Sequence, residues 1–460
     1  MPVDLPIAID RSSGTPLPAQ VVSEVHRLCT AGVLKLGDKL PSTRGLADAL
    51  RVSRNTVAAA YDQLIAEGWV VSKHGAGTFI DARSPQPPAP ASRPVQAAGE
   101  SETAQLIRLV PGAALPGGVA KAAWRRALRA AADTAAQPWP CDIALPEFAD
   151  VVSQQLIRHR GYAQSEVFAT AGTAAVIHEL ALAAGRCLRV GIENPGWQRV
   201  ARILRRCGHE AIPIPADEDG ATVPTGKLDA IVVTPGHQFP AGVRMSAPRR
   251  SQLVEWARRH EAWIVEDDYD GEIRYDSAPL PLLISLAPDR VIHLGSFSKI
   301  LSPELSTGWL LAPASVMAVL RDHRVRTGFR PAVLGQRVIA ALGVHGDLDR
   351  HLKRVRTELA WRRDALLRSL GAGRVTGASS GSHVVVPVPS RLAAPIAAKL
   401  ERQGVLVHTL AHYWSGAGEP PGGLVLGYAG VSRDDLQRGL AAVKAALDFP
   451  NPPAYVNQNP

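Results

Sequence analysis

The segment from residue 40 to residue 80, LPSTRGLADALRVSRNTVAAAYDQLIAEGWVVSKHGAGTFI, constrains the fold of this chain more than any other part. Ser42 and Ser53 each precede apolar side chains at helical spacing, which predicts two capped helices with a turn at residues 51 and 52. Short apolar runs at residues 69–72 and 78–80 flank a glycine-rich tip, which predicts a β-hairpin. Two helices and a hairpin in this order are typical of a domain that reads duplex DNA.

The expected second helix begins with side chains that suit a DNA groove. Its first residues, Ser53, Arg54, Asn55 and Thr56, carry short hydrogen-bonding groups and one guanidinium. Free backbone N–H groups at a helix start also attract phosphate. Arg54 is the best candidate for base readout, because a bidentate guanidinium on guanine is the commonest specific contact. The alternative is a helical hairpin whose polar side chains are simply solvated.

Residues 16–80 resemble the winged helix-turn-helix of the GntR family of bacterial transcription regulators. The resemblance implies contacts to phosphates and base edges from both helices and the wing, namely from Arg44, Ser53, Arg54, Thr56, His74 and Gly75. Ala58 stands where many members of the family have a cation, so we expect one contact fewer.

The formal net charge of +9 is not located where DNA binding would need it. Residues 1–81 hold eight Lys and Arg against eight Asp and Glu, so the expected DNA-binding domain is neutral and the excess lies downstream. One hypothesis is that the arginine-rich segments 321–330 and 350–356 extend a DNA-facing surface. The alternative is that they are solvated helix faces.

The length of 460 residues exceeds what one hydrophobic core normally supports, which predicts a second, larger domain. We expect a DNA-binding domain at 1–81, a proline- and alanine-rich linker at 82–105, a larger domain at 106–450 and a tail at 451–460. An extended linker of this length reaches roughly 70 Å, so a homodimer with swapped domains is geometrically allowed.

Missing sequence signals indicate the cellular compartment in which we expect this protein. The chain has no apolar run of membrane-spanning length and no signal-peptide pattern, so we expect a cytoplasmic protein that does not contact membranes. Its four cysteines, at positions 29, 141, 187 and 207, form no CxxC pair, which argues against a metal site or a disulfide framework. We expect them to be reduced core residues.

From residue 106 onward, short apolar strands alternate with amphipathic helices. The segments VFATAG, RVGIENP, LDAIVVTP, WIVEDDYD and RVIHLGSFSK indicate a mainly parallel, doubly wound α/β sheet. Ligands of such sheets sit outside the carboxyl ends of the strands. The site is therefore expected among the polar residues at those ends, which are Gly172, Asn194, His237, Asp267 and Lys299.

Lys299 follows Ser296 and Ser298 in HLGSFSKILSP, and an amine held there could form a Schiff base with an aldehyde cofactor. Asp267 could keep a pyridine nitrogen protonated, and Tyr269 could hydrogen-bond a ring oxygen. The loop at residues 170–174 opens a helix, so its free N–H groups and the hydroxyl of Thr173 could bind phosphate. Together these features predict a pyridoxal phosphate site.

Residues 106–450 resemble the fold-type I aminotransferases, and the whole chain resembles the MocR-type regulators through the blocks ENPGWQR, TPGHQFPAG, EDDYDGEIRY and GSFSK. The resemblance implies a covalent bond at Lys299, Asp267 facing the pyridine nitrogen, and Tyr269 and the His237 loop near the ring hydroxyl. It implies that Arg199 approaches an amino-acid-like effector. Spacing alone does not decide which acid of residues 266–268 meets the nitrogen, and the block alignment selects Asp267.

The sequence departs from the family pattern at several positions. Ser306 stands where an arginine usually binds the cofactor phosphate, Ala174 replaces a common glutamine, and Trp197 replaces a tyrosine. Residues 423–426 lack the arginine that many aminotransferases use against a substrate carboxylate. We therefore expect a pyridoxal phosphate-responsive transcription regulator of vitamin B6, amine or amino-acid genes. The alternatives are an active aminotransferase and a regulator whose second domain only dimerises.

Overall fold

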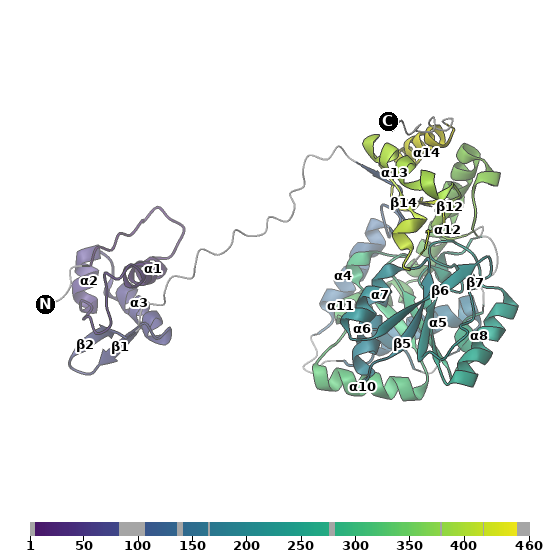
Figure 1. The fold of residues 1–460 in the computed structure, drawn as a ribbon. Coiled ribbons are helices and arrows are strands. Elements are labelled where there is room, and N and C mark those ends of the chain that lie inside the picture. Colours follow the sequence, from purple (N-terminus) through teal and green to yellow (C-terminus); the bar gives the residue numbers. More distant parts are fainter. Residues whose placement is uncertain are drawn as a thin grey trace, which may run out of the picture. The chain divides into compact units, whose positions relative to one another are not determined.

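The computed structural model describes residues 5–81, 106–135, 141–163, 166–275, 281–377, 380–416 and 418–448 (Figure 1). Its contacts separate into two compact units, residues 1–103 and 104–460. The predicted linker at 82–105 and the predicted tail at 451–460 lie outside the described residues. Among the residues that the structure describes, no helix is both long and apolar enough to span a bilayer.

The N-terminal unit is a three-helix domain with a hairpin. Its elements are α1 (Leu17–Thr30), α2 (Thr43–Leu50), α3 (Arg54–Ala66), β1 (Val70–Lys73) and β2 (Gly77–Ile80). The hydroxyl oxygens of Ser42 and Ser53 each accept a hydrogen bond of 3.1 Å, from the backbone N–H of Gly45 and Thr56 respectively. The two predicted caps are therefore confirmed.

The turn between α2 and α3 is tight because Arg51 adopts a left-handed conformation, with φ of +53°. The hairpin is also confirmed, and its first strand begins at Val70 rather than at Trp69. Val25 of α1 and Val57 and Leu64 of α3 are fully buried together, so apolar side chains from the helices fix the angle at which α3 is presented.

The larger unit is built on an eight-stranded sheet with the strand order β4-β11-β10-β9-β8-β5-β6-β7. Strands β10, β9, β8, β5 and β6 pair in parallel with one another. At the two sides of this parallel group, β11 is antiparallel to both β10 and β4, and β7 is antiparallel to β6. This confirms the predicted mainly parallel sheet. The strands are β4 (Phe168–Thr170), β5 (Arg189–Asn194), β6 (Glu210–Asp217), β7 (Gly220–Ala221), β8 (Ala230–Val233), β9 (Trp263–Asp268), β10 (Val291–Ser296) and β11 (Gly308–Leu311).

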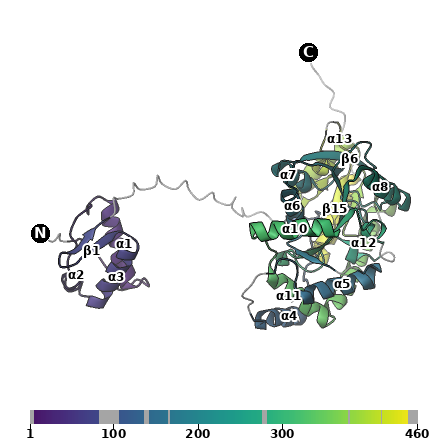
Figure 2. The same cartoon turned by 90° about the horizontal axis from the view of Figure 1, so that it is seen from below.

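Helices cover both faces of this sheet (Figure 1, Figure 2). One face packs against α6 (Thr173–Ala183), α7 (Gln198–Arg206) and α10 (Ala314–Thr327). The other face packs against α5 (Pro146–Arg160), α8 (Ala247–His260), α11 (Val333–Val344) and α12 (Asp347–Leu370), with α4 (Lys121–Asp133) against α11. Successive residues of one strand face opposite layers, as Ile264 and Val265 do, which is why these strands read as continuous apolar runs.

A smaller subdomain follows α12. Its antiparallel sheet has the order β12-β15-β14, and a separate strand near the start of the unit, β3, pairs in parallel with β13. These elements are β3 (Ile107–Arg108), β12 (His383–Val386), α13 (Ser390–Arg402), β13 (Val405–Leu406), β14 (His408–Thr409), β15 (Leu424–Gly427) and α14 (Arg433–Leu447). Short helices complete the unit: η1 (Gly271–Ile273), α9 (Leu283–Leu286), η2 (Pro303–Leu305), η3 (Ala372–Arg374) and η4 (Leu410–Tyr413).

Two expectations about individual residues are corrected. Arg324 is neither DNA-facing nor solvated, because it is fully buried and bonded to Glu179, and the guanidinium of Arg356 donates internally to the carbonyl of Glu272. The four cysteines are free, but only Cys29 is buried and Cys187 is exposed. Arginine and cysteine side chains occur both in buried and in exposed positions, so the sequence pattern did not distinguish the buried residues from the exposed ones.

Candidate functional site

The residues expected to bind DNA lie on the first turns of α2 and α3 and at the hairpin tip. Arg44, Arg54 and Asn55 are exposed, as are His74 and Gly75 at the tip. The hydroxyls of Ser53 and Thr56 lie 2.8 Å apart, so both belong to the cap of α3. The guanidinium of Arg54 is therefore presented at a helix start whose first backbone donors are partly satisfied by the Ser53 cap.

A cavity of about 680 Å³ opens at the carboxyl ends of the parallel strands in the larger unit. Of the residues expected at the site, all line this cavity except His237 and Asn194. Asn194 is buried, and its side-chain oxygen accepts a hydrogen bond of 2.8 Å from the backbone N–H of Ser415. The expected residues that do line the cavity are Gly172, Thr173 and Ala174 at the start of α6, Trp197 and Arg199 around the start of α7, Asp267 and Tyr269 at the end of β9, and Ser296, Ser298 and Lys299 after β10.

Lys299 points across the cavity mouth toward residues before α4, and its ammonium donates to the carbonyl oxygen of Gly112. Burial lowers the pKa of this amine, although the carboxylate of Asp267 acts in the opposite direction. A lowered pKa increases the share of uncharged amine near neutral pH, and the uncharged amine is the form that attacks carbonyl carbon.

Three acids follow one another at the end of β9, and packing gives each a different partner. Glu266 accepts from the backbone of Leu283 and lies 3.0 Å from His293, while Asp268 is paired with Arg160. Only Asp267 lines the cavity, and its carboxylate accepts a hydrogen bond of 3.3 Å from the hydroxyl of Thr173. Burial raises the pKa of Asp267 to about 7, so the site favours a cationic or proton-sharing partner there.

His237 lies behind the cavity rather than in its wall, and the expectation that it lines the site is corrected. Its Nδ1 lies 2.7 Å from a carboxylate oxygen of Asp270 and 3.0 Å from the phenol of Tyr269, which also donates to the His237 carbonyl at 2.9 Å. Burial raises the pKa of Tyr269 well above its usual range, so the phenol stays protonated. From the same loop, Thr234 and Phe239 line the cavity instead.

Comparison with known proteins relates both units to known families. Residues 17–80 match the family model described as bacterial regulatory proteins, gntR family. Over 98% of this chain and 100% of the relative, the chain is 34% identical to the HTH-type pyridoxine biosynthesis transcriptional regulator PdxR of Corynebacterium glutamicum. The chain belongs to the MocR-type subfamily of the GntR transcription regulators. It is also 29% identical to the probable rhizopine catabolism regulatory protein MocR of Rhizobium meliloti, over 96% of each chain.

The larger unit has the fold of the fold-type I aminotransferases. It resembles the kynurenine aminotransferase of Pyrococcus horikoshii, with a TM-score of 0.66 and 24% identity over 75% of this chain and 91% of that one. It also resembles an archaeal alanine:glyoxylate aminotransferase, with a TM-score of 0.68 and 21% identity over 74% and 90%. These likenesses establish the fold of the MocR-type regulator's second unit.

The cavity offers backbone N–H groups to an anion, but the arginine that usually binds the cofactor phosphate in this family is replaced by Ser306. Gly172, with φ of +91°, precedes α6 without a side-chain cap, so the first N–H groups of α6 remain available. The hydroxyl oxygen of Ser296 accepts from the N–H of Ser298, while Thr173 directs its hydroxyl to Asp267 rather than toward the N–H groups of α6. Ser306 caps η2, donates to the carbonyl of Pro303 and is not in the cavity wall.

Sequence reasoning missed several lining residues of the MocR-type cavity. Arg202 lies one turn after Arg199 on α7, and this i, i+3 spacing was a signal that could have identified it. Gln198, between the predicted residues Trp197 and Arg199, was also missed. The others come from segments far away in the chain: Pro111, Gly112, Ser382, His383, His408, His412 and Tyr413. Burial and the neighbouring His412 lower the pKa of His408 to about 4, so His408 is neutral near pH 7.

The raised pKa of Asp267 gives a prediction for the protein without cofactor. The folded state binds this proton more tightly than the unfolded chain, so the acid's contribution to stability is full below about pH 4 and is lost as the pH rises through about 7. Asp267→Asn removes this loss and is expected to raise the free energy of unfolding at pH 8 by roughly 2–4 kcal/mol. The two proteins should have similar stability at pH 4.

Urea unfolding at pH 4, 6 and 8 measures this effect. Glu218→Gln, at an exposed acid, is the matched control and should leave the pH dependence unchanged. If Asp267→Asn is no more stable than the wild type at pH 8, the pKa of the Asp267 carboxyl is not raised in the folded protein.

Proposed function

We propose that this MocR-type regulator binds pyridoxal phosphate through Lys299, and that occupancy of the cavity changes the affinity of its helix-turn-helix domains for an operator. The observation that carries the proposal is one cavity lined by both a lysine of lowered pKa, Lys299, and a buried carboxyl, Asp267, which accepts a hydrogen bond from the hydroxyl of Thr173. When bound, the cofactor supplies an aldehyde that condenses with primary amines.

The residues present fit the cofactor's groups. Asp267 would hold the pyridine nitrogen, Tyr269 would donate to the ring oxygen, and Trp197 would pack against the ring. Ser296, Ser298 and the backbone N–H groups of Thr173 and Ala174, the first of α6, would bind the phosphate. His237 and Asp270 would fix the phenol of Tyr269 from behind, as positioning residues.

We propose sensing rather than transamination. At the segment where many aminotransferases place an arginine against the substrate carboxylate, Val425 is fully buried in an apolar cluster with Val385, Leu410 and Tyr413. The cations that line the cavity instead are exposed Arg199 and Arg202 on α7. They would hold the anionic group of an amine or amino-acid effector.

The proposed assembly is a homodimer, with residues 1–81 as DNA-binding domain, 82–105 as linker and 106–450 as sensor. Two DNA-binding domains would occupy half-sites about 34–36 Å apart, or a multiple of that spacing. The ligand must bind one arrangement of the domains more tightly than another, because equal affinity for both shifts nothing. Vitamin B6 genes are one candidate for control, since the PdxR relative is named for pyridoxine biosynthesis.

The test begins with an operator obtained by selection from random duplexes. Its affinity is measured by fluorescence anisotropy with and without pyridoxal phosphate, for the wild type and for Lys299→Ala. We expect a change of at least about fivefold in the wild type, corresponding to about 1 kcal/mol of coupling, and none in the variant. Unchanged wild-type affinity would leave a regulator whose second unit only dimerises, and multiple-turnover transfer to an oxoacid would indicate an aminotransferase.

A separate prediction concerns the recognition helix. Arg54→Ala is expected to weaken operator binding by about 1–3 kcal/mol and to relax selectivity at one base pair, because a bidentate contact to guanine is lost. Arg27→Ala is the matched control, since Arg27 is bonded to Glu24 on α1. If Arg54→Ala weakens all duplexes equally, Arg54 contacts phosphate and not a base.

A further inference from the structure

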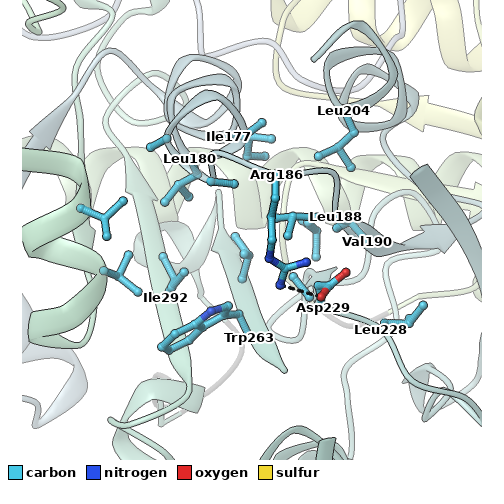
Figure 3. Close-up of a pocket in the computed structure, with 18 of the residues that line it drawn as sticks. Ile177, Leu180, Arg186, Leu188, Val190, Leu204, Leu228, Asp229, Trp263 and Ile292 are labelled. Carbon is cyan, nitrogen blue, oxygen red and sulfur yellow. Dashed lines mark hydrogen bonds and ion pairs between the residues drawn. The ribbon is translucent and has the colours of Figure 1, made fainter. Parts of the chain in front are cut away.

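A second cavity lies at the other end of the parallel strands, near their first residues, and it shares no lining residue with the first cavity. It has a volume of about 480 Å³ (Figure 3). Its walls come from the later turns of α6, from α10 and from the strands beneath them, and include Ile177, Leu180, Val190, Trp263 and Ile292. The helix α6 therefore contributes its first residues to one cavity and its later turns to the other.

The two faces of the sheet differ at this point in how completely helices cover them. Ile231 and Ile264, which face α5 and α8, have no exposed area, whereas Val232 and Val265 retain 8% and 7%. Interior strands of a parallel sheet are normally covered on both faces. The helix layer of α6 and α10 thus leaves apolar strand surface in contact with the cavity.

The charged side chains that line the cavity balance one another. Arg186 donates to Asp229 at 2.8 Å (Figure 3). Lys227 and Glu261, which are both exposed, are of opposite sign. The strand residues that form the floor, such as Val232, Val265 and Ile292, are aliphatic. Because burying an unpaired charge against such a floor is costly, the cavity selects an uncharged ligand.

A peptide segment is a poor occupant. The floor strands β5, β8, β9 and β10 are each hydrogen-bonded to a strand on both sides, so they offer no free edge to an added strand. Backbone N–H and C=O groups brought into the cavity would lose their water without gaining partners. A hydrocarbon or aromatic molecule has no such groups to satisfy.

We propose that this cavity is a binding site for an uncharged aromatic or branched aliphatic small molecule. Its volume is within the range of natural ligand pockets and is roughly three times that of an engineered apolar cavity that binds benzene, so a two-ring compound fits. Trp263 supplies an aromatic wall against which a ring can pack.

Titration calorimetry with indole tests the proposal, using the full chain in the presence and absence of saturating pyridoxal phosphate. We expect saturable one-to-one binding under both conditions. Ala183→Trp on α6 fills the cavity and is expected to weaken indole binding at least about tenfold. Ala318→Trp places the same side chain at an exposed position of α10 outside the cavity and is expected to leave the affinity unchanged.

Two further measurements keep the result decisive. Val319→Glu puts a carboxylate at a half-exposed lining position that tolerates charge, so it tests the cavity should Ala183→Trp fail to fold, and it should weaken indole binding severalfold. Indole-3-acetate should bind more weakly than indole. The proposal is overturned if indole shows no saturable binding, or if both lining variants bind indole with wild-type affinity. Tighter binding of indole-3-acetate than of indole, or competition between indole and pyridoxal phosphate, would also overturn it.

Discussion

Lys299→Ala is expected to abolish covalent attachment of pyridoxal phosphate to this regulator. The wild-type chain, incubated with the cofactor and then reduced with borohydride, should carry one phosphopyridoxyl group on Lys299 by mass spectrometry of the intact chain and its peptides. The reason is local: Lys299 is the one lysine among the residues that line the cavity, and burial there lowers its pKa.

Lys353→Ala is the matched control for this experiment, because Lys353 is an exposed lysine on α12 away from the cavity. It should be labelled to the same extent as the wild type. Wild-type labelling spread evenly over surface lysines, or an unmodified Lys299, would contradict the proposed sensor while leaving the DNA-binding assignment intact. If the Lys299→Ala variant is not labelled but still changes the absorbance spectrum of added pyridoxal phosphate, the variant binds the cofactor noncovalently.

Much of the fold could be predicted because its signals are local. Ser42 and Ser53 cap α2 and α3 through backbone donors only three residues away, and the strands of the parallel sheet are continuous apolar runs. The part of the cavity lining that follows the strand ends was also predicted, since the carboxyl ends of parallel strands lie at the same end of a sheet.

Residue spacing was insufficient, or misleading, where distant segments decide a side chain's environment. Spacing could not choose among three consecutive acids at the end of β9, because Arg160 lies 108 residues before Asp268 and His293 lies 27 residues after Glu266. His237 was misplaced because its ring contacts Asp270 and the phenol of Tyr269, and of these three residues only Tyr269 lines the cavity. The histidines of η4 and β14 reach the cavity only after the smaller subdomain has docked.

Arg324→Ala is expected to destabilise the larger unit by about 3–5 kcal/mol, because it leaves the carboxylate of Glu179 buried without its partner. Both side chains are almost completely excluded from solvent, and the guanidinium contacts both carboxylate oxygens, at 2.5 and 3.0 Å. It also donates to the carbonyls of Asp142 and Ala169, so one side chain joins α6 and α10 to β4 and to the residues before α5.

The measurement is urea unfolding followed by tryptophan fluorescence in the full chain. Of nine tryptophans only Trp69 lies in residues 1–81, so the signal reports mainly on the larger unit. Arg321→Ala, one turn earlier on α10, breaks a half-exposed pair with Glu166 and should cost less than about 1 kcal/mol.

A double variant separates the unpaired charge from the lost contacts. Arg324→Met combined with Glu179→Leu removes both charges and should recover a large part of the stability, although the carbonyls of Asp142 and Ala169 remain without their donor. If Arg324→Ala is as mild as Arg321→Ala, the guanidinium is not buried and the arginine-rich segment regains its place among candidate DNA contacts. If it is strongly destabilising, the basic excess of this chain includes charges that hold the sensor fold together and never meet a phosphate.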